Sequence, residues 1–136
     1  MPSSDNGLPG VLDIAVDAAP GANGHTLPHL AVAGELDLAG IPALEEALAG
    51  LEGAHPPAIV LDLTALEFLD SSGLRCLVRA NARARESGGR LAIVTTPGGR
   101  VAQTISLTGL DDHLEVHTDL DAATASETTK AGDQRG

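Results

Sequence analysis

The chain has 136 residues, a length that suits one domain, and its hydrophobic content of 43% is ordinary for a soluble globular protein. Its formal net charge of −11 repels the phosphates of nucleic acids. The single aromatic residue, Phe68, offers no surface on which successive bases could stack. Binding to nucleic acid is therefore not expected, and the core must be built from Leu, Val, Ile and Ala.

The sequence carries no signal for a membrane, a metal or a cofactor. The residues after Met1 include neither the basic start nor the apolar segment of a signal peptide. No apolar run approaches the roughly 20 residues that a membrane helix needs. Cys76 is the only cysteine, so neither an internal disulfide nor a cysteine-based metal cluster is expected. The five histidines are scattered over expected loops and strand ends. We therefore expect a soluble cytoplasmic protein without metal or cofactor.

The order of apolar runs and breakers predicts one folded domain over residues 11–125, between disordered tails at 1–10 and 126–136. β-branched and apolar runs predict strands, and apolar residues at three- and four-residue spacing predict helices. Gly40 is the expected N-cap of the first helix, with Pro42 in its first turn. The expected order is strands 11–17 and 29–36, helix 41–51, strand 58–63, a helix after the turn at 70–73, strand 90–94, helix 101–108, strand 114–117 and a last helical turn or two within 119–125.

This order of elements defines the fold class. A strand–helix–strand crossover requires parallel neighbours, whereas the opening pair of strands is free to be antiparallel. The sequence therefore predicts an α/β fold, with a mixed, mostly parallel sheet of four to five strands and helices packed against it.

The stretch from Ala58 to Arg85 is the centre of this arrangement. An apolar run suited to a buried strand leads to Asp70-Ser71-Ser72-Gly73, and a helical pattern follows. Ser and Asp side chains can accept hydrogen bonds from the free N–H groups at a helix start. Spacing alone leaves two interpretations of the serines, because Ser71 or Ser72 could cap the helix and Ser71 could also be a phosphorylation site.

Neighbouring residues have ordinary interpretations from the residues alone. Glu35 and Asp37 can be simple loop carboxylates, and Arg75, Arg79 and Arg83 can form a solvated helix face. Cys76 and Phe68 are expected in the core. The sequence has no Gly-x-Ser-x-Gly elbow, no convincing Ser/His/Asp triad and no phosphate-loop lysine, so enzyme activity is not predicted.

The chain resembles the STAS domain family, most closely the single-domain anti-sigma factor antagonists of bacteria. Three features carry the resemblance: Gly34-Glu35-Leu36-Asp37 after the second strand, Leu61-Asp62-Leu63 leading into Asp70-Ser71-Ser72-Gly73-Leu74, and the pattern around Gly109-Leu110. The resemblance extends from about Val11 to Ala125. The strand with the central turn is its most specific part.

The resemblance implies a partner switch. The unmodified antagonist would bind an anti-sigma factor that is also an ATP-binding Ser/Thr kinase, and this binding would release the sigma factor. The kinase would phosphorylate Ser71 and end the complex, and a separate Ser/Thr phosphatase would restore the active form. An alternative within the family is a scaffold subunit of a lipid-transport or stress-signalling complex that is not phosphorylated. The residues expected to contact the partner are Glu35, Asp37, Asp70, Ser72, Gly73, Arg75 and Arg79.

Overall fold

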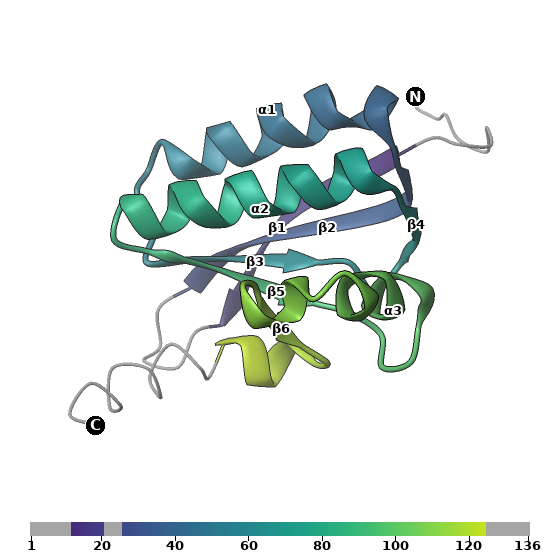
Figure 1. Cartoon of the computed structure of the whole chain (residues 1–136). Coiled ribbons are helices and arrows are strands. Elements are labelled where there is room, and N and C mark those ends of the chain that lie inside the picture. Colours follow the sequence, from purple (N-terminus) through teal and green to yellow (C-terminus); the bar gives the residue numbers. More distant parts are fainter. Residues whose placement is uncertain (1–11, 21–25, 125–136) are drawn as a thin grey trace.

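The computed structural model describes residues 12–20 and 26–124 (Figure 1). The predicted tails at 1–10 and 126–136 lie outside these residues. The elements are β1 (Leu12–Pro20), β2 (Thr26–Leu36), the 3-10 helix η2 (Leu38–Gly40), α1 (Ile41–Glu52), β3 (Ala58–Asp62), β4 (Leu66–Leu69), α2 (Ser71–Glu86), β5 (Arg90–Val94), α3 (Arg100–Leu107), the 3-10 helix η3 (Leu110–Asp112) and β6 (Glu115–His117). A further helix begins at Leu120.

The predicted fold class is confirmed, because the strands form one mixed and mostly parallel sheet. Its order is β1-β2-β3-β5-β6, and β4 pairs with β2 beside this path. β1 runs antiparallel to β2, as expected for the opening pair, and the other pairings are parallel.

The sheet has six strands, one more than the upper predicted number, and the additional strand is β4. β4 has four residues, of which the two ends are buried and the middle two are exposed, so it lacks the alternation that marks a strand. β2 is long enough to pair with β3 through His29–Ala31 and then with β4 through Gly34–Leu36. The backbone accommodates the second pairing with a register shift between Gly34 and Glu35, where Gly34 adopts a φ of 99°.

Alternating side chains of the strands supply two cores on opposite faces of the sheet. Leu30, Leu61 and Ile93 belong to the larger core, which they share with apolar residues of α1, α2 and α3. Val60 and Val94 belong to a smaller core, completed by Leu120 and Ala123 of the last helix. Figure 1 shows α1 and α2 side by side over one face and this last helix on the opposite side of the sheet.

The helix boundaries follow the expected chemistry with one difference. Gly40 is the N-cap of α1, and a proline lies in the first turn, as predicted. α2 begins at Ser71, so Ser71, Ser72 and Gly73, expected in a turn before the helix, instead form its first turn. None of the helices within residues 12–20 and 26–124 combines the length and apolar character needed to cross a bilayer.

The prediction that Phe68 lies in the core is wrong. Its side chain is 41% exposed. β4 pairs with β2 alone and lies beside the main path of the sheet, so a residue in its middle can face solvent. The aliphatic core is closed without any aromatic residue.

Gly73 provides a test of how tightly α2 is seated. A Cβ atom at this position would meet Leu69 Cδ1 at 2.5 Å and Leu36 Cγ at 3.1 Å, and both leucines are buried. We expect Gly73→Ala to lower the free energy of unfolding by about 1–3 kcal/mol, despite the better helix propensity of alanine. Urea denaturation measures the change.

Gly50→Ala is the matched control, because a Cβ at this exposed position of α1 meets nothing within 4 Å. The same chemical change should there raise stability by about 0.5–1 kcal/mol. Equal effects at the two positions would contradict the close seating of α2.

Candidate functional site

The exposed hydroxyl of Ser71 stands at the first residue of α2. Ser72 is half-buried, and Gly73 is buried. Asp70 is the N-cap, with an extended backbone, and its carboxylate accepts a hydrogen bond from the Gly73 N–H at 3.0 Å. The capping function therefore belongs to Asp70 rather than to either serine. The Ser71 side chain is left at the surface of a rigid helix start.

The end of β2 is attached to this turn. Leu36 pairs with Leu69, and the Asp70 N–H donates to the Leu36 carbonyl at 3.2 Å. Glu35 and Asp37 are the residues on either side of Leu36, so the pairing carries both carboxylates to the start of α2. Glu35 lies opposite Phe68 in the register, and Asp37 accepts from the Ala39 N–H at 3.1 Å to cap η2. Two segments that are 33 residues apart thus form one surface.

Two exposed apolar side chains lie on the same segments, and sequence reasoning missed both as site residues. Leu38, directly after Asp37, is 72% exposed, and Phe68, two residues before Asp70, is 41% exposed. A single exposed apolar residue is common on protein surfaces and needs no explanation. Two of them beside Ser71 and the two carboxylates form a surface that suits contact with another protein. Leu and Phe occur in buried and exposed positions alike, so their residue types gave no signal.

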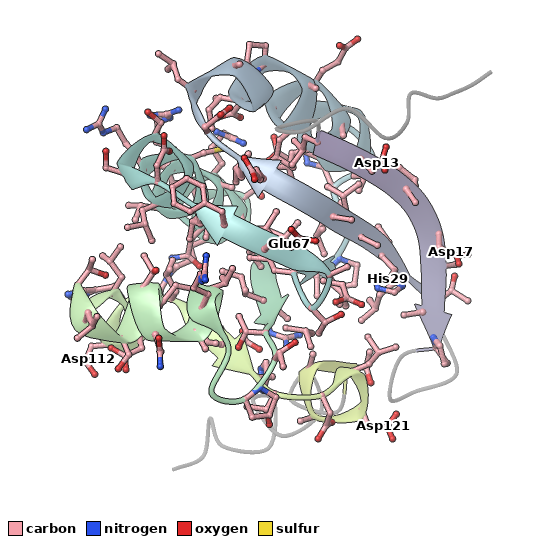
Figure 2. All side chains as sticks on the ribbon, turned by 90° about the vertical axis from the view of Figure 1, so that its right-hand side faces the viewer. Asp13, Asp17, His29, Glu67, Asp112 and Asp121 are labelled. Carbon is pink, nitrogen blue, oxygen red and sulfur yellow. The ribbon has the colours of Figure 1, made fainter. Side chains whose placement is uncertain are left out.

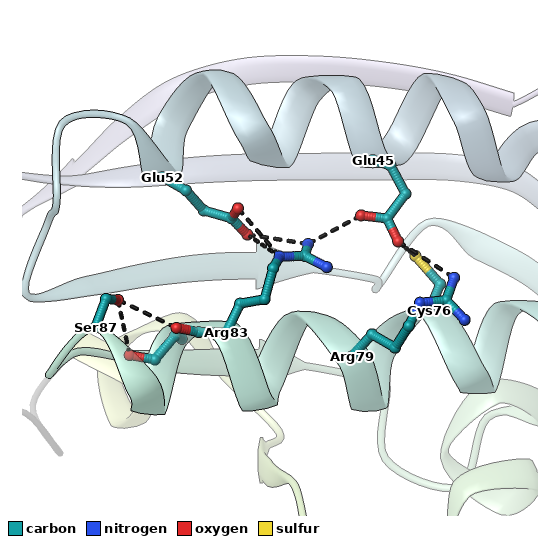
Figure 3. Close-up of polar contacts among 7 residues, drawn as sticks. Glu45, Glu52, Cys76, Arg79, Arg83 and Ser87 are labelled. Atoms are coloured by element: carbon teal, nitrogen blue, oxygen red, sulfur yellow. Dashed lines mark hydrogen bonds and ion pairs between the residues drawn. The ribbon is translucent and has the colours of Figure 1, made fainter.

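Two arginines of α2 are tied to α1 by ion pairs (Figure 3). Arg79 bonds Glu45 of α1 at 3.3 Å, and Arg83 bonds Glu45 at 2.9 Å and Glu52 at 3.0 Å. Arg75, one turn after Ser71, is exposed and takes part in none of the ion pairs found in the described part of the chain. Arg79 and Arg83 thus join the two helices, whereas Arg75, four residues after Ser71, has no ion pair of this kind.

Cys76 is buried, as expected, and its thiol is unreactive. Burial raises the pKa of its thiol to about 12, and the nearby negative charge of Glu45 adds to the effect. Its Sγ lies 3.4 Å from the Glu45 carboxylate. The thiol is therefore protonated near neutral pH and is no nucleophile.

A family model described as "Mlab, STAS domain" matches residues 22–120. The anti-sigma-F factor antagonist RsfB of Mycobacterium tuberculosis is 36% identical over 91 residues, which cover 67% of this chain and 73% of that protein.

Solved structures agree with these sequence matches. The crystal structure of an anti-sigma factor antagonist from Mycobacterium paratuberculosis has 32% identity and a TM-score of 0.73, and the match covers 85% of this chain and 93% of that chain. The unphosphorylated form of the anti-sigma factor antagonist SpoIIAA has 19% identity and a TM-score of 0.58, covering 81% and 92%, so it supports the fold alone.

The architecture is that of a SpoIIAA-like α/β domain, with a strand–turn–helix junction at the exposed Ser71. The chain belongs to the STAS domain family, as its sequence predicted.

The capping bond of Asp70 can be tested directly. Asp70→Ala removes the acceptor for the Gly73 N–H and should lower the free energy of unfolding by about 0.5–2 kcal/mol. Asp70→Asn keeps an acceptor oxygen and should retain most of the stability. Thermal or urea denaturation of the three proteins distinguishes loss of the hydrogen bond from loss of charge, and an equally large loss in Asp70→Asn would refute the capping assignment.

Proposed function

We propose that this protein is an anti-sigma factor antagonist that binds an anti-sigma factor Ser/Thr kinase in its unphosphorylated form. Binding releases the sigma factor, and phosphorylation of Ser71 by the ATP-bound kinase ends the complex. A Ser/Thr phosphatase restores the active form. The observation that carries this proposal is the exposed Ser71 hydroxyl, which the capping role of Asp70 leaves available to another protein. The similarity to anti-sigma factor antagonists of mycobacteria supports the same general role.

The partner-binding surface in this proposal is the region around that hydroxyl. It comprises the predicted contact residues of the turn and α2, together with the carboxylates that β2 carries to the same place. Leu38 and Phe68 add apolar area that a partner can bury. The full proposed set is Glu35, Asp37, Leu38, Phe68, Asp70, Ser72, Arg75 and Arg79. Gly73, also expected from the resemblance, is buried and supports this surface from beneath.

Phosphorylation acts as a switch through charge. A phosphoserine carries about −1.5 to −2 charges at neutral pH, so Ser71 would change from a neutral hydroxyl to the strongest local charge. The adjacent Asp70 is already acidic, and a partner surface fitted to this pair meets excess negative charge. Like charges brought together at an interface cost several kcal/mol. The modified form therefore dissociates.

The same phosphate is well tolerated by the protein itself. It stands at the N-terminus of a helix of 16 residues, where the backbone dipoles favour an anion. Arg75 lies four residues further along the helix, at the spacing that brings side chains of one face together. The switch in this proposal is thus a local change of the surface rather than a refolding.

The first test is phosphorylation by the cognate kinase with Mg-ATP, followed by mass spectrometry. Wild type and Ser72→Ala should each gain one phosphate, whereas Ser71→Ala should gain none. Ser72→Ala is the matched control, since it removes the neighbouring hydroxyl. Absence of any mass gain in wild type would favour the alternative of an unphosphorylated STAS scaffold subunit in a lipid-transport or stress-signalling complex.

Binding to the kinase gives a second, independent result. Ser71→Ala should bind about as tightly as wild type, whereas Ser71→Asp should raise the Kd by about 100-fold because it introduces charge at the interface. Isothermal titration calorimetry measures both. The reverse order of affinities would overturn the mechanism.

Phosphorylation should leave the fold nearly unchanged. We expect the same helical circular dichroism before and after modification, and a change in the free energy of unfolding below about 1 kcal/mol. A large loss of helicity in the phosphorylated protein would show that the switch acts by unfolding α2 instead.

A further inference from the structure

The sheet face opposite α1 and α2 contains an open hollow of about 410 Å³ over β1, β2 and the segment after β3. Its floor consists of small apolar side chains: Ala15 of β1 and Ala31 and Ala33 of β2. The helix that begins at Leu120 covers the neighbouring part of this face, around Val60 and Val94. Because the three alanine side chains are short, an extended chain can approach the sheet closely here.

Carboxylates stand on both sides of this floor. The register places Ala15 opposite Ala31 and Ala31 opposite Asp62, so the three residues form one row across β1, β2 and β3. On the edge strand, Asp13 and Asp17 flank Ala15 at the two-residue spacing that keeps side chains on one face. Figure 2 shows Asp13 and Asp17 spaced along β1, with His29 on the neighbouring strand. The floor therefore lies between one half-buried carboxylate and two exposed ones.

Asp62 is held in place and in its charged form. Its carboxylate accepts from the Thr64 N–H at 3.0 Å and the Thr64 hydroxyl at 2.7 Å, and His29 Nε2 lies 3.1 Å from its other oxygen. Burial acts to raise the pKa of Asp62, but these contacts outweigh burial and lower the pKa below its usual value. A carboxylate has about four lone-pair sites, so these three contacts leave room for one further donor.

Charge decides what can occupy the hollow. The arginines of the described segments lie on α2, at the start of β5 and at the start of α3, and none lines this hollow. A second copy of the chain, with its net charge of −11, would be repelled from an acidic face, as would an anionic membrane surface. A cationic segment is attracted to it, and its neighbouring side chains must be small to lie on the alanine floor.

We propose that this hollow docks a basic, extended segment of a protein partner, with one Lys or Arg side chain placed between Asp62 and Asp13 and small residues on Ala15, Ala31 and Ala33. The surface lies across the sheet from the core shared by α1 and α2, so it is separate from the Ser71 site. A partner bound here leaves Ser71 accessible. The inference therefore stands apart from the proposed function.

The probe is the peptide acetyl-Ala-Arg-Ala-Arg-Ala-Arg-Ala-amide, titrated into the ¹⁵N-labelled full chain at low salt. We expect amide chemical-shift changes concentrated at Ala15, Ala31, Ala33 and Thr64, weakening as salt is added. Asp13→Asn should raise the Kd about 2- to 5-fold, as for loss of one exposed ion pair. Asp111→Asn, the same charge change on exposed η3, should leave the Kd unchanged.

A steric variant separates docking from general attraction. Ala15→Leu keeps every charge and fills the floor from an exposed edge position, so it should abolish the localised shifts while the spectrum remains that of a folded protein.

Equal effects of Asp13→Asn and Asp111→Asn, or shifts spread over all acidic surfaces, would overturn the proposal. So would the absence of binding, or shifts in the hollow that depend on protein concentration without peptide, since these indicate a second copy. Phosphorylation by the kinase should be unaffected by Asp13→Asn, which keeps this test independent of Ser71.

Discussion

The end of β2 fixes the position of everything that surrounds Ser71. β2 pairs first with β3 and then, beyond a register shift at Gly34, with the short strand β4. The backbone hydrogen bond from Asp70 to Leu36 continues this pairing into the first turn of α2. The Leu36 side chain then packs against Gly73, where a larger residue would clash. The Ser71 hydroxyl, the carboxylates of Glu35 and Asp37 and two exposed apolar residues are thereby held on one framework.

Within this framework, the side chains that stabilise the fold differ from the exposed serine side chain. Asp70 satisfies the helix start, so Ser71 has no capping task and remains at the surface. Glu45 and Glu52 bind Arg79 and Arg83 and join α1 to α2 (Figure 3). A modification of the serine can therefore change the surface charge while the bonds that define the fold stay in place.

Sequence patterns predicted the fold well where burial is periodic. The apolar runs at 58–63 and 90–94 and the helical spacing after Ile41 each reflect one continuous buried face, so they correspond to β3, β5 and α1. β4 escaped detection because only its terminal residues are buried and its register is shifted. Phe68 was placed in the core by its residue type, but exposure is decided by what covers a strand, and that is a tertiary property.

Most residues of the candidate site could be predicted from the sequence, but their arrangement in space could not. The Asp70–Gly73 motif marks a helix start, but Asp and Ser are about equally good caps, so spacing could not choose between them. The adjacency of Glu35 and Asp37 to the turn came from the family resemblance, because it depends on the pairing of β2 with β4 that local patterns do not encode. The position of Leu38 beside the turn and the hollow with its alanine floor likewise depend on strand pairings between segments distant in the sequence.

The close fit around Gly73 limits how such a protein can diversify. A side chain at that position displaces Leu36 or Leu69, so substitution of the second residue after Ser71 costs stability. Substitution is tolerated more easily at the exposed positions nearby, where Leu38, Phe68 and Arg75 face solvent and contribute little to the core. Related chains can thus keep the same helix start while differing in the exposed side chains around it.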